Sequence, residues 1–115
     1  MSDVEILRRR AEAQASLAAD RAEADAEMLR LHENALAALR DPDVAEDMRV
    51  EALLTTRDWE DRGTVDENHI RSWKTILAME DEDVAAAILA DSDEARALRR
   101  ITPFSQEALT YQGRG

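Results

Sequence analysis

The sequence predicts an all-α protein, in which a long Ala-rich helix, an arm of coiled-coil-like character, joins a compact bundle of about four shorter helices. Three observations predict this class. Residues 4–40 lack Gly and Pro and are rich in Ala, Leu, Arg and Glu, the best helix formers. Apolar residues recur at spacings of three and four, and no stretch alternates as a strand would. Gly, Pro and capping residues divide the remaining chain into short segments.

The long helix is predicted over residues 4–40 and carries two apolar stripes. At 1.5 Å per residue it would be about 55 Å long, whereas a compact domain of this size has a radius of gyration of about 13 Å. We therefore expect it to project beyond its own fold. Stripe one consists of Val4, Leu7, Ala11, Ala15, Ala18, Ala22, Ala26, Leu29 and Leu36. Stripe two lies about 130° further round the helix and consists of Ile6, Ala13, Leu17, Ala24, Met28, Leu31, Ala35 and Ala38.

Two apolar stripes indicate a helix with two neighbours, one being the rest of the chain and the other a second chain. The arm residues expected to bind a partner are Leu7, Leu17, Met28, Leu29, Leu31 and Leu36. His32 falls in the polar strip between the stripes. Because Ala buries little area, such contacts would be close but weak. The alternative interpretation is a long surface helix whose Ala residues are incidental.

Pro, Gly and capping residues predict the bounds of the second and third helices. Asp41-Pro42 ends the arm and is expected to start a helix over residues 42–62, with Asp41 as its cap and Gly63 as its left-handed stop. Thr64 and Glu67 have capping-box spacing and predict a helix over residues 66–79. Trp73 is expected at the centre of the core, because it shares a face with neighbouring Ile and Leu residues.

Two more helices are predicted over residues 82–90 and 93–101, capped by Asp81 and Ser92. A last short turn is expected within residues 105–111, and residues 112–115 form a flexible tail. The predicted organisation is an arm over residues 1–41 and a bundle over residues 42–111 that packs against part of the arm.

Composition restricts the classes of function. The net charge of −11 opposes a general affinity for nucleic acid or an anionic membrane and favours a basic protein partner. With no cysteine, the chain has neither disulfides nor thiolate chemistry. No apolar run has the length of a membrane span, and no signal-peptide core is evident, so we expect a cytoplasmic protein.

The densest charge feature is the acidic patch, seven acids and no base within residues 80–94. Its members are Glu80, Asp81, Glu82, Asp83, Asp91, Asp93 and Glu94. One interpretation is a surface for a basic partner. The other is helix capping, because helix starts attract acidic residues. Trp59 is a possible exposed anchor for a partner, since Trp is enriched at binding hot spots.

Catalytic and metal-binding signals are missing from the sequence. His32 and His69 stand in no metal-ligand pattern, and no nucleophile, base and orienting group can be assembled. We therefore expect no enzyme activity, no cofactor and no metal. We expect no sequence-specific DNA binding, since the segment in the position of a recognition helix, residues 82–91, offers no Lys, Arg, Asn or Gln.

The function expected from the sequence is a non-enzymatic protein-interaction module of bacterial or phage type. It would act as an adaptor, regulator or assembly component and use its arm for self-association or docking. The alternative is an acidic inhibitor or nucleic-acid mimic, antitoxin-like or anti-defence, that blocks a basic partner surface through the acidic patch.

Overall fold

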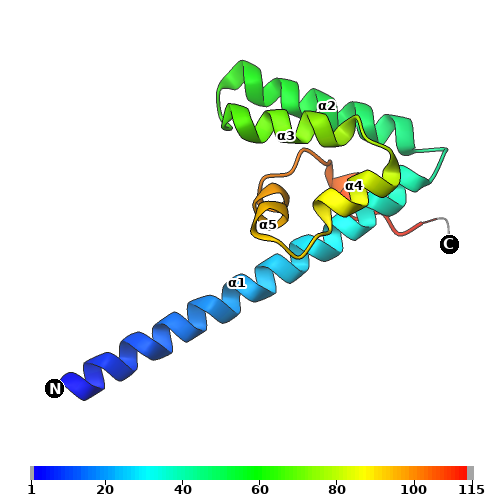
Figure 1. Ribbon diagram of the computed structural model, residues 1–115. Helices are drawn as coiled ribbons and strands as arrows, with labels where there is room; N and C mark the ends of the chain where they lie inside the picture. The colour runs from blue at the N-terminus through cyan, green and yellow to red at the C-terminus, as the bar shows by residue number, and fades with distance from the viewer. Residues whose placement is uncertain (1, 114–115) are drawn as a thin grey trace.

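The computed structural model describes residues 2–113, and this part of the chain contains helices, turns and loops but no strand. The helices are α1 (Asp3–Arg40), α2 (Ala45–Arg62), α3 (Glu67–Leu77), α4 (Asp81–Ile88), α5 (Asp93–Arg100) and α6 (Gln106–Leu109) (Figure 1). The predicted all-α class is confirmed. The bundle holds five short helices rather than four, because residues 106–109 complete a turn of their own. The predicted tail lies partly outside the described residues, which end at Gly113.

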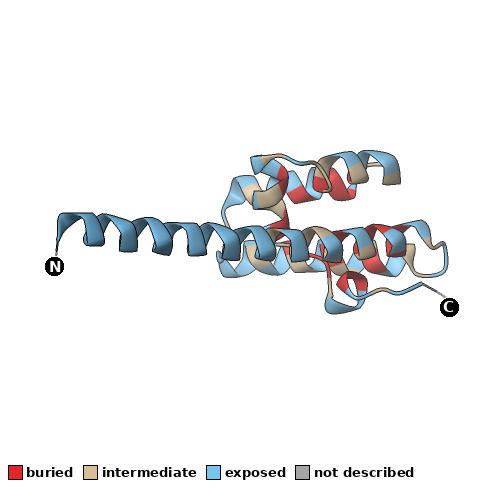
Figure 2. Cartoon of the chain, turned by 90° about the horizontal axis from the view of Figure 1, so that it is seen from below, coloured by how far each residue is buried: buried red, intermediate tan, exposed pale blue. Residues whose placement is uncertain are grey.

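The long helix α1 makes the molecule elongated. The Oγ of Ser2 caps it by accepting the Glu5 N–H at 3.3 Å. The molecule extends 62 × 38 × 21 Å, and its radius of gyration of 17.8 Å exceeds the value of about 13 Å expected for a compact chain of this length. Residues 3–24 are all exposed, and the buried residues of α1 lie between His32 and Leu39 (Figure 2).

The core forms where the last third of α1 meets the other helices. Leu36 and Leu39 from α1 pack with residues of α2, α3, α4 and α6 in one cluster. Trp73 of α3 is the largest fully buried side chain, which confirms it as a core residue. Its indole Nε1 donates to the carbonyl oxygens of Leu98 and Ile101, at 3.2 and 3.0 Å. The C-terminal end of α5 is thereby tied to α3.

Within the bundle, helices α2 and α3 form a hairpin (Figure 1). Gly63 ends α2 in the left-handed conformation, with φ 64° and its N–H bonded to the Trp59 carbonyl, as expected. The expected cap at Thr64 is wrong. Asp66 caps α3 instead, since its carboxylate accepts the Asn68 N–H at 2.8 Å.

The start of α2 also differs from the prediction. Residues 42–44 form a turn, and the helix begins at Ala45. The Asp41 carbonyl accepts the N–H groups of Val44 and Ala45. Val44 has φ −122°, which is outside helical values, and this residue separates the turn from α2.

Arg99 joins α5 to the end of α4. It is buried, and its Nη1 donates to the carbonyls of Ile88 and Ala90 at 2.7 and 3.2 Å. These carbonyls lie at the C-terminal end of α4, where the helix leaves acceptors unpaired. Burial, reinforced by the charge of Arg96, lowers the pKa of the Arg99 guanidinium. The Ser92 cap at the other end of α5 is as predicted, with Oγ accepting the Ala95 N–H.

Replacing Arg99 by Met is expected to lower the free energy of unfolding by about 1–3 kcal/mol, because two carbonyls lose their donor while the volume is nearly kept. Arg96→Met is the matched control. Arg96 pairs with Asp91 and Asp93, both fully exposed, so its loss should lower stability clearly less than the loss of Arg99. Urea unfolding of both variants makes the comparison, and equal losses would contradict the buried role of Arg99.

None of the helices within residues 2–113 has an apolar stretch long enough to cross a membrane.

Candidate functional site: the projecting arm

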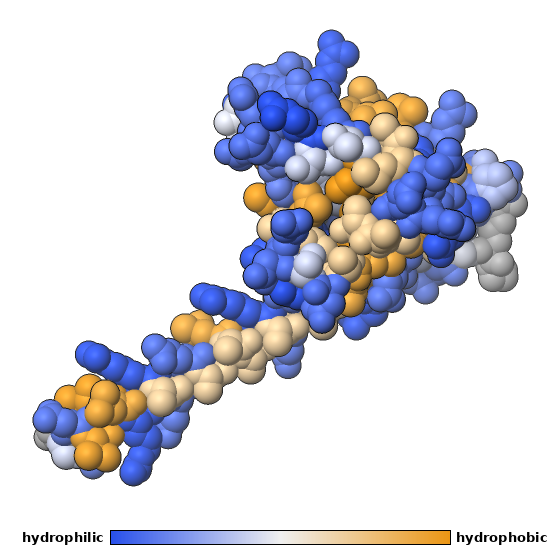
Figure 3. Space-filling view, viewed as in Figure 1, coloured by the Kyte–Doolittle hydropathy of each residue, from blue (hydrophilic) through white to orange (hydrophobic). Residues whose placement is uncertain are grey.

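The arm, defined here as residues 3–24 of α1, is a bare helix of about 33 Å at 1.5 Å per residue. All of its residues are exposed, including large apolar ones. Val4, Leu7 and Leu17 are 65%, 63% and 57% exposed. Figure 3 shows apolar side chains following the arm from its tip to the bundle. A helix of this kind does not bury its own apolar surface, so the arm is the strongest candidate for a binding site.

Both stripes of α1 become covered at the same level, where the helix enters the bundle. Stripe two is exposed through Ala24, half-buried at Met28 and Leu31, and buried at Ala35 and Ala38. Stripe one is exposed through Ala26, half-buried at Leu29 and buried at Leu36. The bundle therefore leaves stripe one open along the whole arm.

An ion pair marks the base of the arm. The guanidinium of Arg100 on α5 contacts the Asp25 carboxylate at 3.3 Å. Together with Arg21, Ala24 and Met28, these residues line a shallow hollow of about 300 Å³. The hollow is where the arm leaves the bundle, and the ion pair holds α5 against this end of the arm.

The six expected contact residues of the arm fall into three groups. Leu7 and Leu17 are exposed on the arm. Met28 and Leu29 are half-buried just beyond its base. Leu31 packs against the core, and Leu36 is buried in it. Leu31 and Leu36 therefore pack in the protein's own fold, whereas Leu7 and Leu17 are exposed where a partner could contact them.

The acidic patch is partly occupied by arginines from its own chain. Asp81 pairs with Arg49 of α2 at 2.8 Å, and Arg96 pairs with Asp91 and Asp93 at 2.7 and 2.6 Å. The hydrogen bond from Arg96 lowers the pKa of the Asp93 carboxyl. The remaining members Glu80, Glu82, Asp83 and Glu94 are exposed. The expected cap at Asp81 is wrong, because Glu80 occupies the cap position of α4 and its side chain makes no capping hydrogen bond. Local ion pairs and positions in the first turns of α4 and α5 therefore account for part of this charge.

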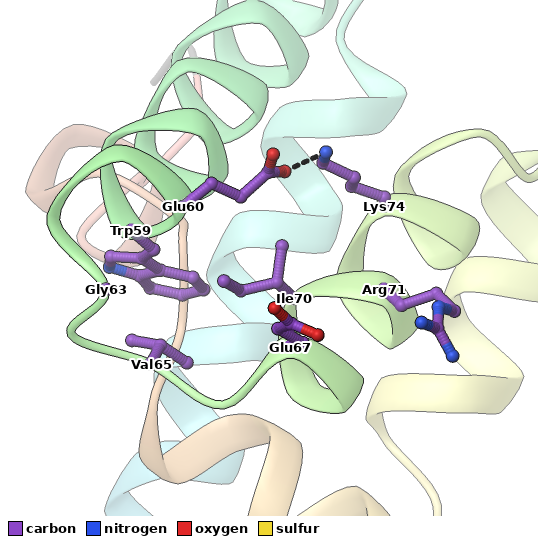
Figure 4. Close-up of a pocket in the computed structure, with 8 residues that line it drawn as sticks. All are labelled: Trp59, Glu60, Gly63, Val65, Glu67, Ile70, Arg71 and Lys74. Carbon is purple, nitrogen blue, oxygen red and sulfur yellow. Dashed lines mark ion pairs between the residues drawn. The ribbon is translucent and has the colours of Figure 1, made fainter.

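Trp59 is half-buried rather than a free anchor. It lines a hollow of about 450 Å³ at the turn between α2 and α3, with Val65 and Ile70 beside it (Figure 4). The rim carries the ion pair between Glu60 and Lys74. The hollow is open and mixed in polarity, and nothing in its lining selects one kind of ligand.

A second exposed apolar patch lies on the outer face of α2 and consists of Val50, Leu53 and Leu54. Their i, i+3 and i+4 spacing places them on one side of the helix. The buried residues of α2 are instead Met48, Ala52 and Thr56. The patch spans barely more than one turn, so it is smaller than the arm.

His32 was expected in a polar strip, and this expectation is wrong: its side chain is fully buried. Its ring stacks on Trp73 with centroids 6.1 Å apart and meets the edge of Phe104 at 5.9 Å. Nδ1 lies 2.7 Å from the Met28 carbonyl, which can only accept, so Nδ1 carries the hydrogen. Nε2 then accepts from the Thr102 hydroxyl at 2.9 Å.

The environment of His32 is that of a core residue. Burial lowers its pKa, the hydrogen bond to Met28 opposes this shift, and the charge of Arg99 adds to it. The neutral ring joins α1 to the segment after α5. Within residues 2–113, no three His, Asp or Glu side chains are grouped as metal ligands would be.

Comparisons with protein-family models, curated proteins and solved structures find no match to this chain.

Proposed function

We propose that the protein is a non-enzymatic interaction module whose bundle holds the arm in place and whose arm binds another protein helix. The observation that carries the proposal is the continuous exposed stripe one, which begins at Val4 and reaches the bundle without being covered. The 22 residues of the arm are all exposed, so helix propensity rather than core packing stabilises most of this segment. A partner along stripe one would supply the missing packing.

The rigid base supports a docking role. The ion pair between Asp25 and Arg100 and the burial of α1 beyond His32 fix the direction in which the arm leaves the bundle. A partner helix therefore meets a pre-oriented surface, which reduces the ordering cost of binding. The alternative role as an acidic inhibitor has less support, because Arg49 and Arg96 already engage three acids of the proposed surface.

The test places a photo-activated cross-linking amino acid at Leu7 of the full chain in the cells that express it. We expect light to produce one or a few discrete protein adducts. Arg9 is the matched control, because it lies on the side of the helix opposite stripe one and should give few or none. Equal adducts at both positions, or none at Leu7, would contradict docking through stripe one.

A further inference from the structure

The arm contains an eleven-residue repeat. Residues 10–14 read RAEAQ and residues 21–25 read RAEAD. Stripe one follows the same period, because residues 4, 15 and 26 and residues 7, 18 and 29 are all Val, Ala or Leu. Eleven residues make three turns at about 3.67 residues per turn, close to the natural helix. Stripe one therefore runs almost parallel to the helix axis, and a straight second helix can follow it.

The spacing of stripe one is the same when read in either direction. Its steps from Val4 to Leu29 are three, four, four, three, four, four and three residues. The midpoint lies between Ser16 and Leu17. An identical helix running the opposite way can therefore place apolar residues against apolar residues along the whole stripe. The opposed pairs are Val4 with Leu29, Leu7 with Ala26, Ala11 with Ala22, and Ala15 with Ala18.

Charge along the arm is complementary to its own reversed copy. Arg8, Arg9 and Arg10 form a basic cluster near the tip, whereas Glu23 lies near the base, beside Asp25, which pairs with Arg100 of its own bundle. Reversal about the midpoint brings residues 8–10 of one copy to the level of residues 23–25 of the other, at two symmetric places. A parallel pair in register would instead bring the two arginine clusters to the same level. Such complementarity is what sets partner and direction between helices.

We propose that the occupant of stripe one is the arm of a second copy of this chain, paired antiparallel. This inference rests on the proposed function, since it names the partner of the same surface. It uses Val4, Leu7 and Leu29 as the large contacts at the two ends and Ala residues between them, where the helices approach most closely. The two bundles lie at opposite ends of the pair. Stripe one is exposed from Val4 through Ala26, and Leu29 keeps only part of its surface exposed beside the bundle.

The expected pairing is weak. An overlap of residues 4–29 is about 39 Å long, and two helices about 10 Å wide would bury roughly 800 Å² in total. This falls below the range of about 1,200–2,000 Å² of stable complexes. We therefore expect sedimentation of the full chain to show mainly monomer at a few micromolar and mainly dimer at several hundred micromolar. A chain that remains monomeric at the highest of these concentrations would overturn the proposal.

The absence of native cysteine allows the direction to be read by cross-linking. Ala11→Cys and Ala22→Cys are prepared as separate full-length variants and treated with a short thiol cross-linker, alone and mixed. In the antiparallel pair, position 11 meets position 22 of the other copy, whereas two like positions stand about 16 Å apart. We expect a cross-linked dimer from the mixture and little from either variant alone. Efficient cross-linking of Ala11→Cys with itself would indicate a parallel pair and overturn the proposal.

Charge exchange provides a test that does not depend on cross-linking. Arg8 and Glu23 lie on the same flank of stripe one, and residues of the same flank face each other in antiparallel pairs. Arg8→Glu and Glu23→Arg should each weaken self-association about tenfold, because each places like charges opposite one another. The equimolar mixture should recover affinity, because both contacts are then opposite in charge. Failure of the mixture to recover would count against the antiparallel register.

Failure of self-pairing and failure of the proposed function give different results. A monomeric protein whose Leu7 position still forms adducts with a different protein in cells retains an interacting arm but refutes the second copy as its occupant. Adducts absent at Leu7, together with a monomer, would refute both. All these variants change exposed residues of the arm, so the near-ultraviolet signal of buried Trp73 serves as the control for an intact bundle.

Discussion

Replacing Trp73 by Ala is expected to lower the free energy of unfolding by about 3–5 kcal/mol, the usual cost of removing a buried Trp. This is a large fraction of the 5–15 kcal/mol that stabilises typical domains. Trp73 is fully buried, stacks on His32 and meets the edge of Phe104 with ring centroids 5.6 Å apart. Its loss also leaves the Leu98 and Ile101 carbonyls without the indole donor. Urea unfolding followed by circular dichroism measures the effect.

Trp59→Ala is the matched control for Trp73→Ala. Trp59 is half-buried at the end of α2, so its removal should cost clearly less, about 1–2 kcal/mol. If both substitutions lowered stability equally, Trp73 would not hold the central position that its burial indicates. Trp73→Phe separates the packing of the aromatic ring from the hydrogen bonds of Nε1, because Phe keeps a ring but has no donor.

The long helix could be predicted from sequence because its signals are local. Val4–Arg40 was expected, and the structure has Asp3–Arg40. Helix propensity and the absence of Gly and Pro act within a few residues, so no tertiary information was needed. Gly63 and Ser92 were predictable for the same reason, since left-handed backbone and a side-chain cap are settled by one or two residues.

The buried polar residues could not be predicted because they depend on where along the helix the bundle sits. Arg10, Arg21 and His32 are eleven residues apart and share one helical phase. The first two are exposed, whereas His32 is buried, because only the last third of α1 is covered. Helical periodicity shows on which face of the helix a residue lies but not whether another element buries it. Arg99 is a similar case, since its burial depends on the position of the α4 carbonyls that it reaches.

The candidate site was partly predictable. The two stripes pointed to two neighbours, and the last residues of both stripes meet the bundle. Sequence reasoning did not separate the arm residues that serve the fold, such as Leu36, from those that stay exposed, such as Leu7. The burial boundary near Asp25 supplies that distinction. The eleven-residue repeat could have been found from the sequence by aligning residues 10–14 with residues 21–25.

Acidic pH is expected to destabilise the bundle through His32. Burial lowers the folded-state pKa of His32 below its ordinary value of 6.5, whereas the unfolded chain keeps that ordinary value. Protons therefore bind the unfolded chain more readily. The stabilising contribution of neutral His32 is fully present above pH 6.5 and is lost as the pH falls from 6.5 towards the folded-state pKa. Within that window the loss approaches about 1.4 kcal/mol per pH unit.

The His32→Gln variant isolates this effect. Gln can donate to the Met28 carbonyl and accept from the Thr102 hydroxyl, as His32 does, but it does not titrate. It should be less stable than the wild type at pH 7.5, because it loses the ring contacts with Trp73 and Phe104. The difference between the two proteins should shrink as the pH falls from 6.5. Other groups titrate in both proteins and cancel in this difference.

The free energy of unfolding of each protein is measured with urea at a series of pH values. If the two curves of free energy against pH stay parallel down to pH 5, His32 keeps its ordinary pKa in the fold. A nuclear magnetic resonance titration of the imidazole provides the independent reading, because a buried neutral ring should resist protonation below pH 6.5 while the bundle remains folded.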